Sequence, residues 1–301
     1  METYHVPVLL TESCDLMGIA DGGVYVDLTF GGGGHTREIL RRMGPKSHLF
    51  SFDRDSDTTA NLPDDSRFTF IQNNFRFMRG CLRSEGAEQV DAILADLGVS
   101  SHHFDEAERG FSYRFDAPLD MRMNQHSKFS AKELLNEYPQ ELIEKILRQY
   151  GELRESGRIA KAIIKYRETS PLVTINDLLS ILEPCISRGT DRNKFLAQVF
   201  QAIRIEVNGE LDALKMMLEQ SSRVLRPGGR LVIITYHSLE DRLVKNFMRN
   251  GNFDGIPQKD FFGRVETPFE VYNNKPIVPN AEEMERNSRS RSAKLRCAIK
   301  L

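Results

Sequence analysis

A hydrophobic run that leads almost directly into four consecutive glycines constrains the fold of this chain more than any other feature. Val24-Tyr25-Val26-Asp27-Leu28 has the composition of a buried strand, and Gly31-Gly32-Gly33-Gly34-His35 follows it closely. A second such run, residues 49–52, ends at Asp53, twenty residues after Gly33. Glycines at a strand-to-helix turn let a ligand approach the backbone, and an acid about 20 residues later binds ribose hydroxyls. The spacing predicts a nucleoside-binding site in an α/β fold.

The loop itself distinguishes between two kinds of nucleoside cofactor. The dinucleotide fingerprint needs a small residue three positions after its second glycine, where this chain has Thr36 or Arg37. The order Asp27-x-x-x-Gly31-x-Gly33 instead resembles the loop of methyltransferases that use S-adenosylmethionine (SAM), with Thr29 where many of them have a first glycine. SAM is therefore the favoured cofactor, and NAD or a turn without ligand are the alternatives.

Strand-like and helical segments alternate along the first hundred residues. Strands are expected at 24–29, 48–52, 68–72 and 90–95, with a fifth at 230–235, and this alternation predicts a parallel sheet built from βαβ units. Residues 105–204 are too long for a loop and carry capping boxes and helical spacing. We expect a Rossmann-like, mostly parallel α/β domain in two parts, 1–104 and 205–301, with an inserted all-helical domain at 105–204.

Composition limits the classes of function. Of 301 residues, 40% are hydrophobic and 28% charged, and no apolar run approaches the roughly 20 residues that span a bilayer. The N-terminus lacks the features of a signal peptide, and the four cysteines have neither disulfide-framework nor zinc spacing, so a cytoplasmic protein without a metal is expected. With a net charge of −2, any nucleic-acid binding must be local.

Several predicted strands end on residues that suit a cofactor site. Ligands of open α/β sheets lie outside the carboxyl ends of the strands, where the glycine loop, Asp53, Phe75 and Asp96 should converge. Gly33, Gly34 and His35 would admit the methionine part of SAM, Asp53 would bind ribose, and Asp96 would lie near the substrate. Phe75 would lie against adenine or, alternatively, pack in the core.

Long motifs follow in order along the rest of the chain. They are Leu97-Gly98-Val99-Ser100-Ser101, Arg109-Gly110-Phe111-Ser112, Pro118-Leu119-Asp120-Met121-Arg122-Met123, Phe200-Gln201-Ala202-Ile203-Arg204-Ile205, His237-Ser238-Leu239-Glu240-Asp241-Arg242 and Asn287-Ser288-Arg289-Ser290-Arg291-Ser292. From His5-Val6-Pro7-Val8-Leu9-Leu10 to the C-terminus, the chain resembles the RsmH (MraW) family of bacterial 16S ribosomal RNA cytosine-N4 methyltransferases.

The resemblance implies a class I SAM-dependent methyltransferase that acts on a cytosine at the decoding site of 16S ribosomal RNA within the small ribosomal subunit. The inserted domain would recognise the substrate, and the family's SAM contacts carry over to Gly33, Gly34, His35, Asp53, Phe75, Asp96 and His103. His103 stands where the family commonly has glutamine in Pro-Gln-Leu-Asp. An imidazole can replace the amide's hydrogen bond but would add a pH dependence.

The chemistry of the implied reaction assigns further roles. The exocyclic amine of cytosine is a poor nucleophile, so an acceptor must draw on its N–H; Asp96 is the first candidate, and Asp120 and His237 are alternatives. Arg109, Phe111 and Arg122 are candidate substrate contacts, and Phe111 could stack on an unstacked base or pack internally. Arg289, Arg291 and Lys294 could contact phosphate or pair with the protein's own acids.

Three other functions remain to be separated from this one. An NAD-dependent dehydrogenase is disfavoured by the loop, and an RNA-binding assembly factor without catalysis is disfavoured by Asp53 and Asp96. A DNA amino-methyltransferase would carry Asp/Asn-Pro-Pro-Tyr/Phe, whereas Asp96 is followed by Leu97-Gly98-Val99. Oligomeric state is open, and a homodimer is among the alternatives.

Overall fold

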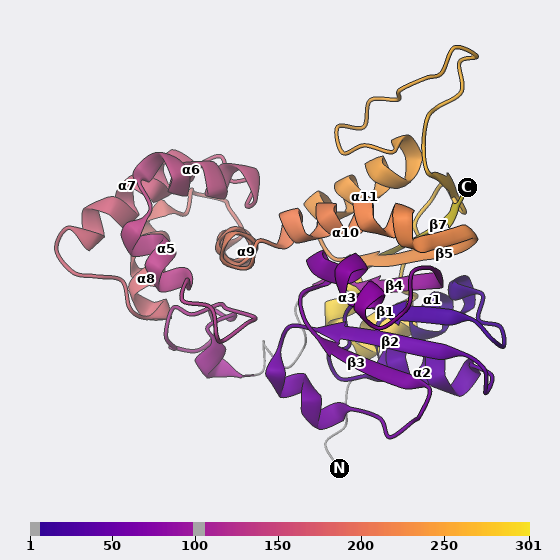
Figure 1. The fold of residues 1–301 in the computed structure, drawn as a ribbon. Helices are drawn as coiled ribbons and strands as arrows, with labels where there is room; N and C mark the ends of the chain where they lie inside the picture. Colours follow the sequence, from indigo (N-terminus) through magenta and orange to yellow (C-terminus); the bar gives the residue numbers. More distant parts are fainter. Residues whose placement is uncertain (1–6, 99–105) are drawn as a thin grey trace. The chain divides into compact units, whose positions relative to one another are not determined.

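The computed structural model describes residues 7–98 and 106–301 of the chain. It divides into two compact units, which are described separately below (Figure 1). The α/β unit comprises Met1–Gly98 and Leu211–Leu301, and the helical unit comprises Val99–Glu210. The boundaries expected from the sequence, 104/105 and 204/205, fall a few residues inside the helical unit at each end.

A seven-stranded sheet forms the centre of the α/β unit, in the order β3-β2-β1-β4-β5-β7-β6. Its strands are β1 (Val24–Asp27), β2 (His48–Asp53), β3 (Phe68–Gln72), β4 (Val90–Asp96), β5 (Leu225–Thr235), β6 (Phe269–Val271) and β7 (Lys294–Lys300). The strands β1 to β5 pair in parallel, and β7 pairs antiparallel with both β5 and β6. The sheet confirms the predicted Rossmann-like, mostly parallel α/β class.

Two apolar cores cover the two faces of this sheet. Alternate strand residues face opposite cores: Val26 and Ile93 lie in one, and Tyr25 and Leu94 lie in the other. The first core includes side chains of α3 (Met78–Ser84), α10 (Glu210–Val224) and α11 (Ser238–Asn250). The second includes side chains of α1 (Leu10–Met17) and α2 (Gly34–Arg42). Helices on both faces leave the carboxyl edge of the parallel strands open for a ligand.

Strands β6 and β7 were not anticipated from the sequence. The C-terminal segment is rich in basic residues, but its Leu295 and Cys297 are fully buried. Strand β5 also begins earlier than expected, at Leu225, and the register with β4 shifts between Val90 and Ala92. Gly228 has φ +81° within the extra residues, so the Pro227-Gly228-Gly229 segment forms an irregularity in the strand.

The helical unit has its own apolar core. Its helices are α5 (Ala131–Glu137), α6 (Gln140–Gln149), α7 (Ser156–Arg167), α8 (Ile175–Leu182) and α9 (Arg192–Asn208), with 3₁₀ turns η3 (Ala107–Arg109) and η4 (Glu183–Cys185). The predicted capping boxes at Ser130 with Glu133 and at Thr174 with Asp177 are both confirmed. Among the described residues, no helix is long and apolar enough to span a membrane.

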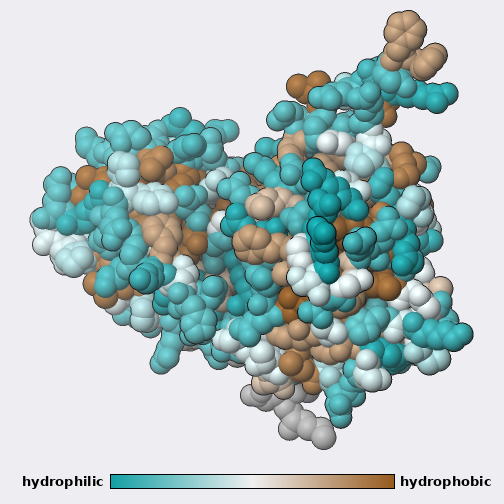
Figure 2. All heavy atoms as spheres, viewed as in Figure 1, coloured by the Kyte–Doolittle hydropathy of each residue, from teal (hydrophilic) through white to brown (hydrophobic). Residues whose placement is uncertain are grey.

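An arm formed by residues 251–268 extends from the end of α11 before the chain enters β6 (Figure 1). Hydrophobic side chains lie at its tip (Figure 2), where Phe261 and Phe262 are 98% and 82% exposed. Asp260 accepts hydrogen bonds from the backbone N–H groups of Phe262 and Arg264, so the tip is a closed turn.

Candidate functional site at the carboxyl edge of the sheet

The loop after β1 leads from the sheet into helix α2. Gly31 and Gly33 have φ of +50° and +75°, which L side chains rarely adopt, and Gly33 is the N-cap of α2. A side chain at Gly31 would meet no atom within 4 Å, so the outer side of this turn is open. Gly34 instead faces the ring of Pro7, 2.2 Å from where its Cβ would lie. We therefore expect a ligand to approach the backbone at the turn around Gly31 rather than at Gly34.

Asp27 holds this loop in place through buried hydrogen bonds. Its side chain is fully buried and accepts hydrogen bonds from the Thr36 hydroxyl at 2.7 Å and the Thr29 N–H at 3.1 Å. Burial raises the pKa of Asp27 to about 6, and the negative charge of Asp53 acts in the same direction. The acidic residue at the start of the loop thus holds the backbone in place for a ligand.

Asp53 joins the ends of two strands. Its Oδ2 accepts from the Gly31 N–H at 2.8 Å, and its Oδ1 accepts from the Asp55 N–H at 2.9 Å. These contacts orient the Asp53 carboxylate, a group that can accept hydrogen bonds from a diol. The structure therefore brings Asp53 and the glycine loop together, as the sequence spacing predicts.

Asp96 ends β4 next to this loop. Its backbone N–H donates to the Thr29 hydroxyl oxygen at 2.7 Å, which links the two strand ends. The side chain is 22% exposed, and its Oδ1 accepts from the Tyr236 hydroxyl at 2.7 Å. Burial raises the pKa of Asp96 to about 7; the hydroxyl opposes this rise, and the charges of Asp27 and Glu240 add to it. A carboxyl group that titrates near neutral pH suits proton transfer.

His35 lies behind Asp96 as a neutral side chain. It is 5% exposed, and burial lowers its pKa to about 4, so the 3.9 Å separation of its Nδ1 from Asp96 Oδ2 is not an ion pair at pH 7. Its Nε2 is buried and has no hydrogen-bond partner among the described residues. An orphaned buried polar atom beside the glycine loop fits a site that is completed by a bound ligand.

The residues after β5 form the other side of the site. Tyr236 was not anticipated, although it directly follows the predicted strand 230–235 at the same carboxyl edge as Asp96. Burial raises the pKa of Tyr236 well above its ordinary value, with the Asp96 charge acting in the same direction, so it remains a donor. Its backbone N–H donates to the buried Glu240 at 3.0 Å. The ends of β4 and β5 are thereby tied to each other and to α11.

His237, an alternative proton acceptor, caps the N-terminus of helix α11. It is the N-cap of α11, where Nδ1 accepts from the Glu240 N–H at 3.4 Å. Its Nε2 lies 3.2 Å from Glu240 Oε1 without forming an aligned hydrogen bond. Both ring nitrogens face Glu240, which leaves Asp96 as the better placed acceptor.

The remaining predicted cofactor contacts are less defined. Phe75 begins the 3₁₀ turn η2 (Phe75–Phe77) after β3, and its partly buried ring packs against the core below the sheet. The core alternative therefore applies to the ring in part, and the contact with adenine stays a prediction. His103 lies outside the described residues.

Four predicted residues belong to the helical unit and hold its first segment together. Arg122 pairs with Asp120 at 2.6 Å and donates to backbone carbonyls of residues 125 and 127. Arg109 is 6% exposed and donates to the carbonyls of residues 122 and 123. Phe111 is 4% exposed in the helical core. The packing alternative accounts for Phe111, and Arg109, Asp120 and Arg122 have bonds within their own unit that a substrate would have to replace.

The C-terminal basic residues divide into two groups. Lys294 pairs with Asp241 at 3.2 Å, so the intramolecular alternative applies to it, and Arg296 pairs with the same carboxylate at 2.6 Å. Arg289 and Arg291 are exposed on the 3₁₀ turn η5 (Ser288–Ser292).

Comparisons with known proteins agree with this geometry. The model of the MraW methylase family matches residues 2–301. A protein of Phocaeicola vulgatus named "Ribosomal RNA small subunit methyltransferase H" is 56% identical over 99% of this chain and 98% of its own length. One of the same name from Parabacteroides distasonis is 55% identical with the same coverage. An rRNA methylase structure from Streptococcus thermophilus covers 99% of both chains with 13% identity and a TM-score of 0.41. The chain is a member of the MraW methylase family.

Proposed function

We propose that this protein transfers a methyl group from SAM to the exocyclic N4 of a cytosine at the decoding site of 16S ribosomal RNA in the small ribosomal subunit. The observation that carries the proposal is the arrangement at the carboxyl edge of the sheet. There Asp96, with a pKa raised to about 7, lies beside the glycine loop and Asp53. The names of relatives more than 50% identical support ribosomal RNA of the small subunit as the substrate.

The residues of the edge fit SAM. The Asp53 carboxylate would accept from the ribose hydroxyls, and Phe75 would lie against the adenine. The turn at Gly31 to Gly33 would face the methionine part, with His35 behind Asp96. Bound there, SAM supplies an electrophilic methyl group.

Asp96 would act on the acceptor amine. The amine's lone pair is delocalised into the cytosine ring, and an ionised Asp96 accepting its N–H would return electron density to nitrogen. The Tyr236 hydroxyl holds Oδ1, which leaves Oδ2 as the oxygen for the amine. A pKa near 7 lets this carboxyl accept the proton during transfer and release it afterwards. Holding the amine in line with the methyl group would supply much of the remaining rate.

Recognition of the RNA is assigned to the helical unit. Arg158, Lys161 and Lys165 follow one another at spacings of three and four on α7, and all three are exposed. Phe115, 53% exposed, is better placed to stack on an unstacked base than the buried Phe111. The row of cations on α7 is suited to contact phosphates, and the exposed ring of Phe115 is suited to contact a base.

Tritium transfer tests this function. Labelled SAM is incubated with small ribosomal subunits that lack their own N4-methylcytosine, and the product nucleoside is identified by mass spectrometry. The proposal predicts label on cytosine N4. Binding of both SAM and subunits without label on RNA would instead favour the non-catalytic assembly factor, and label on another nucleoside would refute the N4 assignment.

A further inference from the structure

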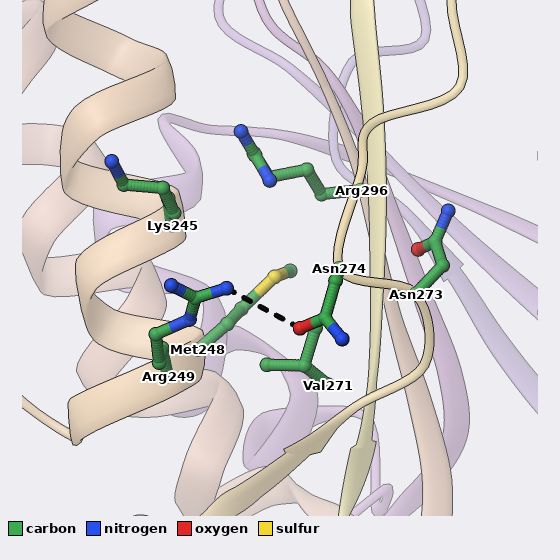
Figure 3. A pocket seen from close by; sticks show the side chains of 7 residues that line it. All are labelled: Lys245, Met248, Arg249, Val271, Asn273, Asn274 and Arg296. Atoms are coloured by element: carbon green, nitrogen blue, oxygen red, sulfur yellow. Dashed lines mark hydrogen bonds between the residues drawn. The ribbon is translucent and has the colours of Figure 1, made fainter.

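A pocket opens on the α/β unit between α11 and the outer strands of the sheet (Figure 3). None of the seven described residues that line this hollow is acidic. These residues are Lys245, Met248, Arg249, Val271, Asn273, Asn274 and Arg296. Three cations and two amides thus surround one open space.

The charge on α11 is not balanced within the helix. Asp241, Lys245 and Arg249 are spaced by four residues, so they share one helical face. The carboxylate that could neutralise Lys245, that of Asp241, accepts from Arg296 Nε at 2.6 Å and from Lys294 Nζ at 3.2 Å. Asp241 therefore has two cationic partners from β7 already. Lys245 and Arg249 are like charges four residues apart on the helix, and their repulsion destabilises the helix when no ligand is bound.

The cations are held in orientations that suit an anion. Arg249 donates from Nη2 to Asn274 Oδ1 at 3.3 Å, which directs its guanidinium across the pocket without removing its charge (Figure 3). Within residues 7–98 and 106–301, Lys245 makes no ion pair. Arg296 is only 10% exposed and is fixed through Nε and Nη2 by Asp241, so its position is set before any ligand arrives.

We propose that this pocket binds a backbone phosphate of the substrate RNA, with Lys245, Arg249 and Arg296 around the phosphate. The proposal rests on the proposed function only in taking ribosomal RNA as the partner. Strand β7 is separated from β4 by β5, so the pocket is an anchoring site away from Asp96. Such a contact positions the RNA and is sequence-independent.

Equilibrium binding of small ribosomal subunits at several salt concentrations, without SAM, tests the pocket independently of catalysis. The test variant is Lys245→Ala with Arg249→Ala, both exposed positions. The matched control is Arg41→Ala with Lys215→Ala, which removes the same charge from cations paired with their own neighbours, Glu38 and Asp212. SAM binding by each variant checks that the α/β unit is folded.

The test variant should bind subunits about tenfold more weakly at low salt, and the slope of log K against log salt should fall by about 1, as expected for one lost phosphate. The control should match the wild type. Equal behaviour of the two variants, or failure of the wild type to bind subunits, would overturn the proposal. Wild-type binding without methyl transfer would refute the proposed function while leaving the pocket supported.

Discussion

The hydroxyl of Tyr236 donates to Oδ1 of Asp96 at 2.7 Å and so connects the carboxyl ends of β5 and β4. This bond selects which carboxylate oxygen remains for a substrate. It also favours the ionised form of Asp96, whose pKa burial raises to about 7. A single hydroxyl therefore affects both the geometry and the charge of the proposed proton acceptor.

Replacing Tyr236 should change the pH profile of catalysis. Without the donor, the pKa of Asp96 should rise by about 1–2 units, since hydrogen bonds to charged groups contribute about 1.5–3 kcal/mol. In Tyr236→Phe, kcat at pH 7 should fall about tenfold, and the difference from wild type should narrow by pH 9. The measurement is kcat from pH 5.5 to 9, with Tyr272→Phe, an exposed tyrosine, as the control. A uniform loss at every pH would argue against this role.

Asp96 should make the folded protein less stable as pH rises. Its pKa is 3.8 in the unfolded chain and about 7 when folded, so the native state resists ionisation and stability is lost between about pH 4 and pH 7. Asp96→Asn keeps the carbonyl acceptor for Tyr236 and removes the buried charge. We expect it to stabilise the protein by about 2–4 kcal/mol at pH 8 and by little at pH 4. Chemical unfolding at both pH values checks this, and equal effects at the two would contradict it.

Asp53 should contribute to cofactor affinity through both carboxylate oxygens. Asp53→Asn retains one acceptor, so the Kd for SAM should rise about 10- to 100-fold, from the loss of one charge-assisted hydrogen bond to the ribose. Calorimetric titration of SAM measures the change. Asp64→Asn, at an exposed position of the following loop, should leave the Kd unchanged. A Kd for Asp53→Asn equal to that of the control would exclude the ribose contact.

The N-cap of α5 should determine the local stability of the helical unit. Ser130 is 7% exposed, its Oγ accepts from the Lys132 N–H at 3.2 Å, and its own N–H donates to Glu133 at 2.9 Å. Ser130→Ala should lower the free energy of opening of α5 by about 0.5–2 kcal/mol. Hydrogen exchange of the α5 amides reports this directly. Ser84→Ala, an exposed position at the end of α3, should leave those amides unaffected.

Local patterns explain which parts of the fold were predictable. The central strands are apolar runs bounded by turn residues, and each capping box joins two residues three positions apart. Both patterns can therefore be recognised in the sequence. Strand β7 was missed because charged residues such as Lys294 and Arg296 do not indicate a buried strand. Their partner is Asp241, more than fifty residues away in the chain, and no local pattern reveals such a pairing.

In the candidate site, too, the residues identified by local position were predictable, and the properties that depend on distant residues were not. Asp53 and Asp96 follow from their positions at strand ends, and the rule that selects them also applies to Tyr236, which directly follows β5. The rule fails for Phe111, because a motif does not indicate whether an aromatic ring faces solvent or the core. The raised pKa of Asp96 depends on burial and on Asp27 and Glu240, which only the folded chain brings together.

The most direct test of the account is single-turnover methyl transfer to small ribosomal subunits by Asp96→Asn beside Asp91→Asn. Both residues lie on β4, but Asp91 pairs with Arg226 near the start of the strand, at the opposite end from Asp96. The account predicts that Asp96→Asn binds SAM normally and loses about 10²- to 10⁴-fold in rate, as expected for a missing proton acceptor. Asp91→Asn should remain close to wild type. A loss of less than tenfold in Asp96→Asn, with SAM and subunits bound, would contradict the role of Asp96 in catalysis.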